Sequence, residues 1–247
     1  MIWRKPESTW FEINIQTIVY LDLESTGLKE SGRPRISEIS LIAVNTKDFL
    51  ELQFIINDYI SKKENCDKLI PRILNKIILC VYPMAPIFPD VSRITGLDNY
   101  NLFGQAKFDT NTVKIIDDFL RRLPAPVCLV SHNGDRFDFP LLKAELEKCG
   151  GKLENNILCA DSYIGIRSIL KSRNDMLSTT SFSLINLHQK FFSCQSEVSH
   201  GAEADCLTLL KVTAVLGAEF IDWIKDNYYE FRHCNTMWNI QGSSQPT

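Results

Sequence analysis

The sequence predicts a single α/β domain in which helices pack against a mixed β-sheet. Short apolar runs rich in β-branched residues come first, and amphipathic helical patterns alternate with the later strands. No polar or glycine-rich stretch is long enough to separate two domains. The expected strands are residues 16–23, 38–44, 51–56, 76–82 and 127–131.

The expected helices follow from the spacing of apolar residues and from the residues at their ends. The first carries apolar side chains at helical intervals and stops before Pro124. The second begins with Pro140, which suits a first helical turn, and stops before Gly150. The third is a long pattern near the end of the chain. The expected helices are residues 111–122, 140–148 and 203–220, and the expected loops are residues 61–68 and 171–183.

Composition argues against several classes of protein. The net charge of −3 gives no global attraction to nucleic acid or to anionic membranes, so a polyanion site needs a local basic patch or bound metal. No apolar run approaches the roughly 18 residues of a membrane span, and the start of the chain has no secretory signal pattern. The eight cysteines show no C-x-x-C spacing, which is typical of buried thiols in a reducing compartment. We expect an intracellular protein of the cytosol, the nucleus or both, with no membrane partner.

Two carboxylates lie at the end of the first predicted strand. Side chains two residues apart point to the same face of a strand, so Asp22 and Glu24 face one way, and Leu21 and Leu23 face the core. Crowded carboxylates repel each other and resist desolvation. A hard divalent cation, which prefers oxygen ligands, relieves this repulsion.

Three further polar residues complete the candidate constellation. Asp138 follows a strand that ends at Ser131 and directly precedes a helix, a position where α/β sheets bind ligands. His200 stands before the last long helix, and Asp205 lies about one and a half turns after it. Taken singly, each residue is better explained as surface charge, as a helix N-cap or as a loop residue. Their combination in this order favours a common site.

These residue types suit phosphodiester hydrolysis. Two Mg²⁺ ions about 3.5–4 Å apart can activate a water and stabilise the leaving 3′ oxygen. Four carboxylates supply oxygen ligands and offset the charge of the ions. A histidine that titrates near neutrality can take the proton from the attacking water.

The sequence resembles the DEDDh 3′→5′ exonucleases of the ribonuclease H-like superfamily, and more narrowly the three-prime repair exonuclease family. The resemblance covers roughly residues 12 to 228 and is specific because long strings match. The matching strings are residues 21–28 (LDLESTGL), 94–97 (ITGL), 128–142 (CLVSHNGDRFDFPLL), 144–146 (AEL), 161–162 (DS) and 200–205 (HGAEAD).

The resemblance implies a ribonuclease H-like fold with a central mixed five-stranded sheet flanked by helices. It implies a DEDDh exonuclease domain over residues 12–230, followed by a partly disordered C-terminal extension over residues 231–247. The implied activity is removal of mononucleotides from the 3′ ends of DNA, single-stranded or frayed. The implied cofactor is Mg²⁺, two ions per active site, with Mn²⁺ able to substitute.

The resemblance also assigns roles to individual residues. Four acids would be both catalytic residues and metal ligands, and His200 would be the general base; the acids are Asp22, Glu24, Asp138 and Asp205. Residues that touch the terminal nucleotide, wedge against the last bases or steady the backbone would be Glu24, Ser25, Leu28, Ile94, Arg136, Phe137 and His200.

The family is homodimeric, pairing strand edges, which here implies residues 75–82 as the paired strand. An apolar edge is otherwise an aggregation hazard, although a buried central strand is the alternative. A proline run and a membrane tail found in one branch of the family are missing from this sequence. Before the string Ser181 to Leu184, Thr179 and Thr180 replace the usual basic residues, and basic charge occurs earlier, at Arg167, Lys171 and Arg173. These earlier residues either contact phosphate from a shifted position or belong to a solvated loop.

Two rival functions remain open from the sequence. An RNA 3′ exonuclease would use the same five catalytic residues, because sugar choice depends on contacts to the 2′ position. A non-enzymatic module that binds nucleic-acid ends would have lost an acid or the histidine, whereas all five are present.

Overall fold

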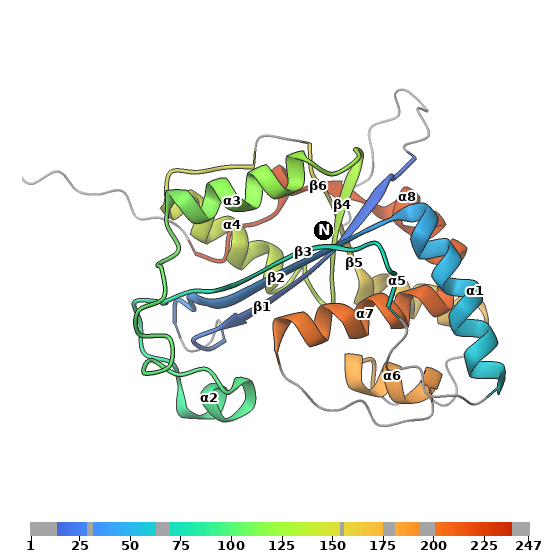
Figure 1. Ribbon diagram of the computed structural model, residues 1–247, viewed down its shortest axis with the longest axis horizontal. Coiled ribbons are helices and arrows are strands. Elements are labelled where there is room, and N and C mark those ends of the chain that lie inside the picture. The colour runs from blue at the N-terminus through green and yellow to red at the C-terminus, as the bar shows by residue number, and fades with distance from the viewer. Residues whose placement is uncertain are drawn as a thin grey trace, which may run out of the picture.

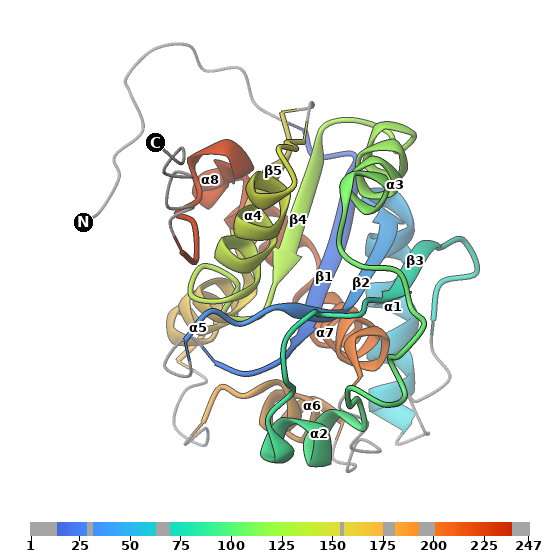
Figure 2. The same ribbon diagram turned by 90° about the vertical axis from the view of Figure 1, so that its left-hand side faces the viewer.

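A six-stranded mixed sheet forms the centre of the protein, in the order β3-β2-β1-β4-β5-β6. The computed structural model describes residues 14–28, 32–62, 70–153, 156–174, 181–192 and 201–238. Figure 2 shows β3, β2, β1, β4 and β5 side by side. The strands are β1 (Thr17–Ser25), β2 (Ile36–Asn45), β3 (Asn75–Cys80), β4 (Val127–Ser131), β5 (Leu158–Asp161) and β6 (Tyr229–Glu230). The β1–β4 and β4–β5 pairs are parallel, and the other pairs are antiparallel.

The expected mixed sheet with flanking helices is confirmed, but the expected number of five strands is one short. The additional strand, β6, has only two residues and pairs antiparallel with the edge of β5. So short a strand leaves no periodic signal in a sequence.

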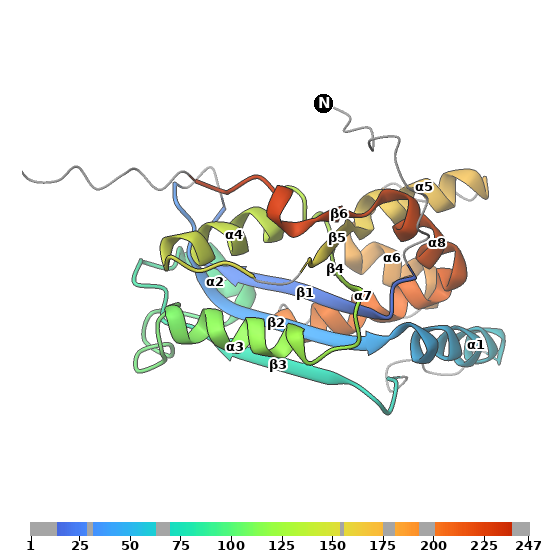
Figure 3. The same cartoon turned by 90° about the horizontal axis from the view of Figure 1, so that it is seen from above.

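Helices cover both faces of the sheet. Figure 1 shows α3 and α4 above it and α7 below it, and Figure 3, seen from above, shows β1 running between α4 and α3. One apolar core lies under α3 and α4, and a second lies under α1, α5, α7 and α8. The helices are α1 (Thr46–Lys62), α2 (Pro89–Thr95), α3 (Thr110–Arg121), α4 (Asp138–Lys148), α5 (Ser162–Ser172), α6 (Leu184–Phe192), α7 (Ala202–Leu216) and α8 (Ala218–Asn227), with the short 3₁₀ helix η2 (Phe231–His233).

Alternation along β1 determines which side of the sheet receives the acids. Leu21 and Leu23 belong to the core under α3 and α4. Ile18 and Tyr20 belong to the core on the α7 side. Asp22 and Glu24 continue the row of Ile18 and Tyr20. The strand therefore directs both carboxylates toward the side on which α7 lies.

The prediction of a strand at residues 51–56 is wrong, because this segment lies within α1. Phe49, Leu52 and Ile56 are its buried residues, at helical spacing. A short apolar run cannot by itself distinguish a strand from a buried helical segment. The helix predicted at residues 203–220 is in fact two helices, because Gly217 adopts φ 51° between α7 and α8.

The two edges of the sheet differ in what lies beside them. β3 is an edge strand that pairs, among the described residues, only with β2, so the alternative of a buried central strand is wrong. After β6, Phe231 and Met237 are buried in the core under α4, although residues 239–247 lie outside the described part. Within the described residues, no helix is both long and apolar enough to cross a lipid bilayer.

Candidate active site

Three carboxylates from two elements meet at one point. Asp22 and Glu24 come from the end of β1, and Asp205 comes from the first turn of α7. One carboxylate oxygen of each lies within 4.8 Å of the others. All three side chains are half-buried, so the cluster remains open to solvent on one side. Three oxygen donors at this separation fit one hard divalent cation.

Asp138 approaches the same cluster from the opposite layer. It is the first residue of α4 and is 5% exposed. Its Oδ2 accepts a hydrogen bond from the Ser131 hydroxyl at 2.8 Å. The backbone of Leu23 on β1 lies close enough to oppose the rise in the pKa of Asp138, and the charge of Asp138 in turn raises the pKa of Asp22, so the two carboxylates lie near each other. Carboxylate oxygens of three of the four predicted acids therefore lie within 4.8 Å of one another, and Asp138 lies close enough to Asp22 for its charge to act on it.

The acids destabilise one another as anions. The pKa of Asp22 is raised well above its ordinary value by burial and then by the charges of Asp138, Asp205 and Glu24. Burial, followed by repulsion from Asp205, raises the pKa of Glu24 to about 8. Burial also raises the pKa of Asp138, and its hydrogen bond from Ser131 opposes that rise. Groups of like charge held this close are typical of a functional site. Because all four offer hard oxygen ligands, their chemistry fits a divalent metal.

The predicted general base, His200, lies outside the described residues. Its neighbour Gly201 is the N-cap of α7 and provides no side-chain cap. Glu38 on β2 provides one instead, because its Oε2 accepts the Ala202 N–H at 2.8 Å. A carboxylate at a helix N-terminus also interacts favourably with the helix dipole. Glu38 thus fixes the start of α7, one turn before Asp205.

Sequence reasoning missed Glu38, and only strand pairing could have revealed it. In the β1–β2 ladder, Glu24 lies directly opposite Glu38. Like charges directly opposite each other on neighbouring strands destabilise the sheet unless each interacts with another group. Here Glu24 joins the acidic cluster and Glu38 caps α7.

The loop between β4 and α4 is held by Asp161, a residue of the matched string 161–162 with no role assigned from the sequence. Its carboxylate accepts the backbone N–H groups of Asn133, Asp135 and Tyr163 at 2.9–3.2 Å. Gly134 is required within this loop, because a Cβ there would lie 2.6 Å from the Cβ of Ser131. The loop geometry therefore depends on close packing beneath it, next to the hydroxyl that binds Asp138.

The residues expected to touch substrate lie around this loop and the end of β1. Leu28 and Ile94 are large apolar side chains that are 62% and 56% exposed. Arg136 is exposed, and Phe137 is half-buried against the core. Ser25 is buried, and its hydroxyl donates to the Gly27 carbonyl oxygen at 2.7 Å.

Two of the basic residues in and directly after α5, Arg167 and Arg173, have partners within the described chain. Arg173 donates from Nε and Nη2 to the carboxylate of Glu219 at 3.0 and 2.6 Å. The guanidinium of Arg167 lies 5.9 Å from the centre of the Phe182 ring. Thr179 and Thr180 lie outside the described residues.

The fold and the acidic cluster define a nuclease of the exonuclease class. A family model described as "Exonuclease" matches residues 19–213. This span includes all four acids. Enzymes of this class depend on divalent metals, and the cluster of carboxylates supplies a matching site.

Comparison with individual proteins narrows the class. The chain is 32% identical to three prime repair exonuclease 2 of Mus musculus over 228 residues, which cover 90% of this chain and 93% of that protein. It is 33% identical to three-prime repair exonuclease 1 of Bos taurus, over 93% of this chain and 73% of that protein. The chain therefore belongs to the three prime repair exonuclease family, whose members are 3′→5′ exonucleases.

Solved structures share the fold. E. coli exonuclease I, in its zinc-bound complex with single-stranded DNA, superposes with a TM-score of 0.61 at 15% identity, over 82% of this chain. The complex of E. coli exonuclease I with a dA16 oligonucleotide gives a TM-score of 0.64. This chain spans about two fifths of those longer proteins. The likeness shows the ribonuclease H-like fold.

Proposed function

We propose that the protein removes mononucleotides one at a time from the 3′ ends of DNA, with a preference for single-stranded or frayed ends. The observation that carries the proposal is the convergence of Asp22, Glu24 and Asp205 within 4.8 Å, with Asp138 held beside them. Two Mg²⁺ ions are the proposed cofactors, with Mn²⁺ as a substitute. The four acids are the proposed ligands.

The protein's own groups prepare the site before substrate arrives. β1 and α7 bring three carboxylates together, and the Ser131 hydroxyl orients the fourth. Bound divalent ions would supply activation of the attacking water and stabilisation of the charge on the departing 3′ oxygen. His200, which directly precedes the capped end of α7, is the proposed acceptor of the proton from that water.

The exposed apolar residues Leu28 and Ile94 suit a nucleic-acid substrate that is bound without base-specific contacts. Leu28 and Ile94 are the proposed wedge against the last bases, since apolar contacts to bases tolerate any sequence. Glu24, Ser25, Phe137 and His200 are proposed to contact the terminal nucleotide, and Arg136 to steady a backbone phosphate. E. coli exonuclease I, which shares the fold, is described in complex with single-stranded DNA, and this supports the choice of substrate.

The edge strand β3 is the proposed site of homodimer formation. Ile77, Ile78 and Leu79 are half-buried there, and the outer side of the strand has no β partner in the described chain. A second copy that pairs with β3 would remove this exposed edge. Reduced thiols at all the described cysteines accord with a cytosolic or nuclear protein, which is the location we propose.

The direct test uses four labelled oligonucleotides: single-stranded DNA, duplex DNA, duplex DNA with a mismatched 3′ end, and RNA. With Mg²⁺ we expect mononucleotide release from the 3′ end, fastest on single-stranded DNA and abolished by EDTA. The His200→Ala variant should lose about 10²–10⁴-fold in rate, and Asp22→Asn should be as damaging through loss of metal. Faster degradation of RNA would overturn the proposed substrate. An unaffected His200→Ala variant would overturn the proposed base.

A further inference from the structure

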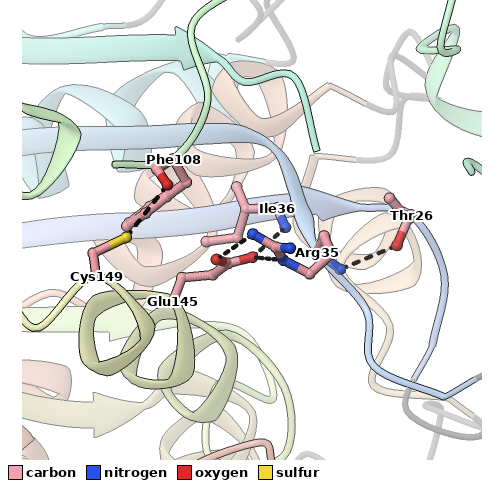
Figure 4. A network of polar contacts seen from close by, with 6 residues as sticks. All are labelled: Thr26, Arg35, Ile36, Phe108, Glu145 and Cys149. Carbon is pink, nitrogen blue, oxygen red and sulfur yellow. Dashed lines mark hydrogen bonds and ion pairs between the residues drawn. The ribbon is translucent and has the colours of Figure 1, made fainter. Parts of the chain in front are cut away.

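One fully buried carboxylate lies outside the acidic cluster and forms an ion pair with an arginine. Glu145 on α4 is 0% exposed. It accepts hydrogen bonds from Nε and Nη2 of Arg35 at 2.5 and 2.9 Å, and from the Ile36 N–H at 3.3 Å (Figure 4). Such a two-point pair fixes the geometry of both partners more strictly than a single contact.

The backbone of Arg35 is joined to the strand that carries two of the acids. The Thr26 N–H donates to the Arg35 carbonyl oxygen at 2.9 Å, and the Arg35 N–H donates to Thr26 Oγ1 at 3.0 Å. Thr26 follows Glu24 by two residues. Arg35 therefore connects the end of β1 directly to α4, as Figure 4 shows.

The position of Glu145 on α4 relates it to the fourth acid. Asp138 and Glu145 are seven residues apart, which places them on the same face of the helix, about 10 Å apart along its axis. Asp138 accepts a hydrogen bond from Ser131 at one end of α4. A second attachment two turns later fixes the rotation of α4 and its distance from β1.

We infer that Arg35 and Glu145 are positioning residues that set α4 against β1, so that Asp138 meets Asp22 and Glu24 around a shared divalent cation. This inference rests on the proposed function, because it assumes that the acids bind metal. Stability alone is a weak reason for this pair, since well-packed apolar residues can replace a buried ion pair with little loss of stability. The specific gain is a fixed geometry between the two elements that carry the ligands.

The test compares metal binding, catalysis and stability in four variants of the full chain. Glu145→Gln removes the charge, Arg35→Lys keeps the charge without the two-point geometry, and the double variant Arg35→Met/Glu145→Leu replaces the pair with apolar side chains. Glu219→Gln is the control for two-point geometry, because Glu219 on α8 forms the same kind of pair with Arg173, the C-cap of α5, at an exposed position. Mn²⁺ affinity is measured by titration calorimetry, kcat and KM by nucleotide release from single-stranded DNA, and Tm by calorimetry.

We expect Glu145→Gln and the double variant to bind Mn²⁺ about 10- to 100-fold more weakly, the usual cost of losing a group that orients metal ligands. Their kcat should fall with KM for DNA nearly unchanged, and excess Mn²⁺ should restore part of it. Arg35→Lys should give an intermediate loss, and it serves as the test where the double variant does not fold. The control should keep parental Mn²⁺ affinity and kcat.

Variants that are less stable but bind Mn²⁺ within twofold of the parent, with unchanged kcat, would show that the pair is only structural and would overturn the inference. The parent protein separates this outcome from failure of the proposed function. A parent that binds no Mn²⁺ and releases no nucleotide refutes the proposed function. If the parent binds Mn²⁺ and releases nucleotides, and the variants keep the parental Mn²⁺ affinity and kcat, only the positioning role is refuted.

Discussion

The hydrogen bond from Ser131 to Asp138 gives the sharpest quantitative prediction. Both residues are buried, and the hydroxyl donates to Oδ2 at 2.8 Å. A hydrogen bond to a charged group contributes about 1.5–3 kcal/mol, and one pKa unit corresponds to about 1.36 kcal/mol. Ser131→Ala should therefore raise the pKa of Asp138 by about 1–2 units further.

Because a metal ligand must be deprotonated, protons compete with the metal for Asp138. The pKa of Asp138 is raised to about 7, so at neutral pH the Ser131→Ala variant should need about 5- to 50-fold more Mg²⁺ for half-maximal activity, and the difference should shrink as the pH rises. The assay is nucleotide release against Mg²⁺ concentration at pH 6.5, 7.5 and 8.5.

The matched control is Thr17→Val on β1. The Thr17 hydroxyl is also buried, and it donates to the Pro124 carbonyl oxygen at 2.7 Å, away from the cluster. This variant should keep the parental Mg²⁺ and pH dependence. If Ser131→Ala matched Thr17→Val in both respects, the role assigned to the hydrogen bond would be refuted.

Three further predictions follow from the same geometry. In EDTA, the folded protein should become less stable as pH rises from about 4.5 to 8, because the raised pKa values of Glu24 and Asp22 mean that it binds more protons than the unfolded chain in this range. Calorimetry should show that Tm falls less steeply with rising pH in Glu24→Gln than in the parent protein. Added Mg²⁺ should raise the Tm of the parent more at pH 8.5 than at pH 5.5. Equal slopes of Tm against pH in Glu24→Gln and the parent would contradict this prediction. Glu38→Ala should lose about 0.5–2 kcal/mol of stability with the cap of α7, and its kcat should fall while Glu38→Gln, which keeps an acceptor, loses less; identical kinetics of the two would rule out the capping role. Gly134→Ala should lower kcat and change KM little, because the Cβ of the new alanine would displace Ser131. Parental activity in this variant would show that the loop tolerates the methyl group.

Much of the candidate site could be predicted from short stretches of sequence. Alternation along one strand is a local property, so the common direction of Asp22 and Glu24 could be inferred from their spacing alone. The positions of Asp138 and Asp205 next to helix starts could be inferred from Pro140 and from the apolar run after residue 205. These residues carry their own local signals.

The supporting residues could not be predicted, because their partners are distant in the sequence. Glu38 acquires its role only when antiparallel register brings it opposite Glu24 and beneath Ala202. Arg35 and Glu145 are 110 residues apart, and no local sequence pattern around either residue indicates that the other is its partner. The error at residues 51–56 has a different cause, since an isolated apolar run fits both a strand and a helix.

Diffraction from crystals grown with Mn²⁺ and a deoxynucleoside monophosphate, recorded at the manganese absorption edge, tests the central claim most directly. Two anomalous peaks about 3.5–4 Å apart, enclosed by the carboxylates of Asp22, Glu24, Asp138 and Asp205, are the predicted result. Manganese bound elsewhere, or a bound nucleotide with Asp138 or Asp205 turned away from the ions, would contradict the account.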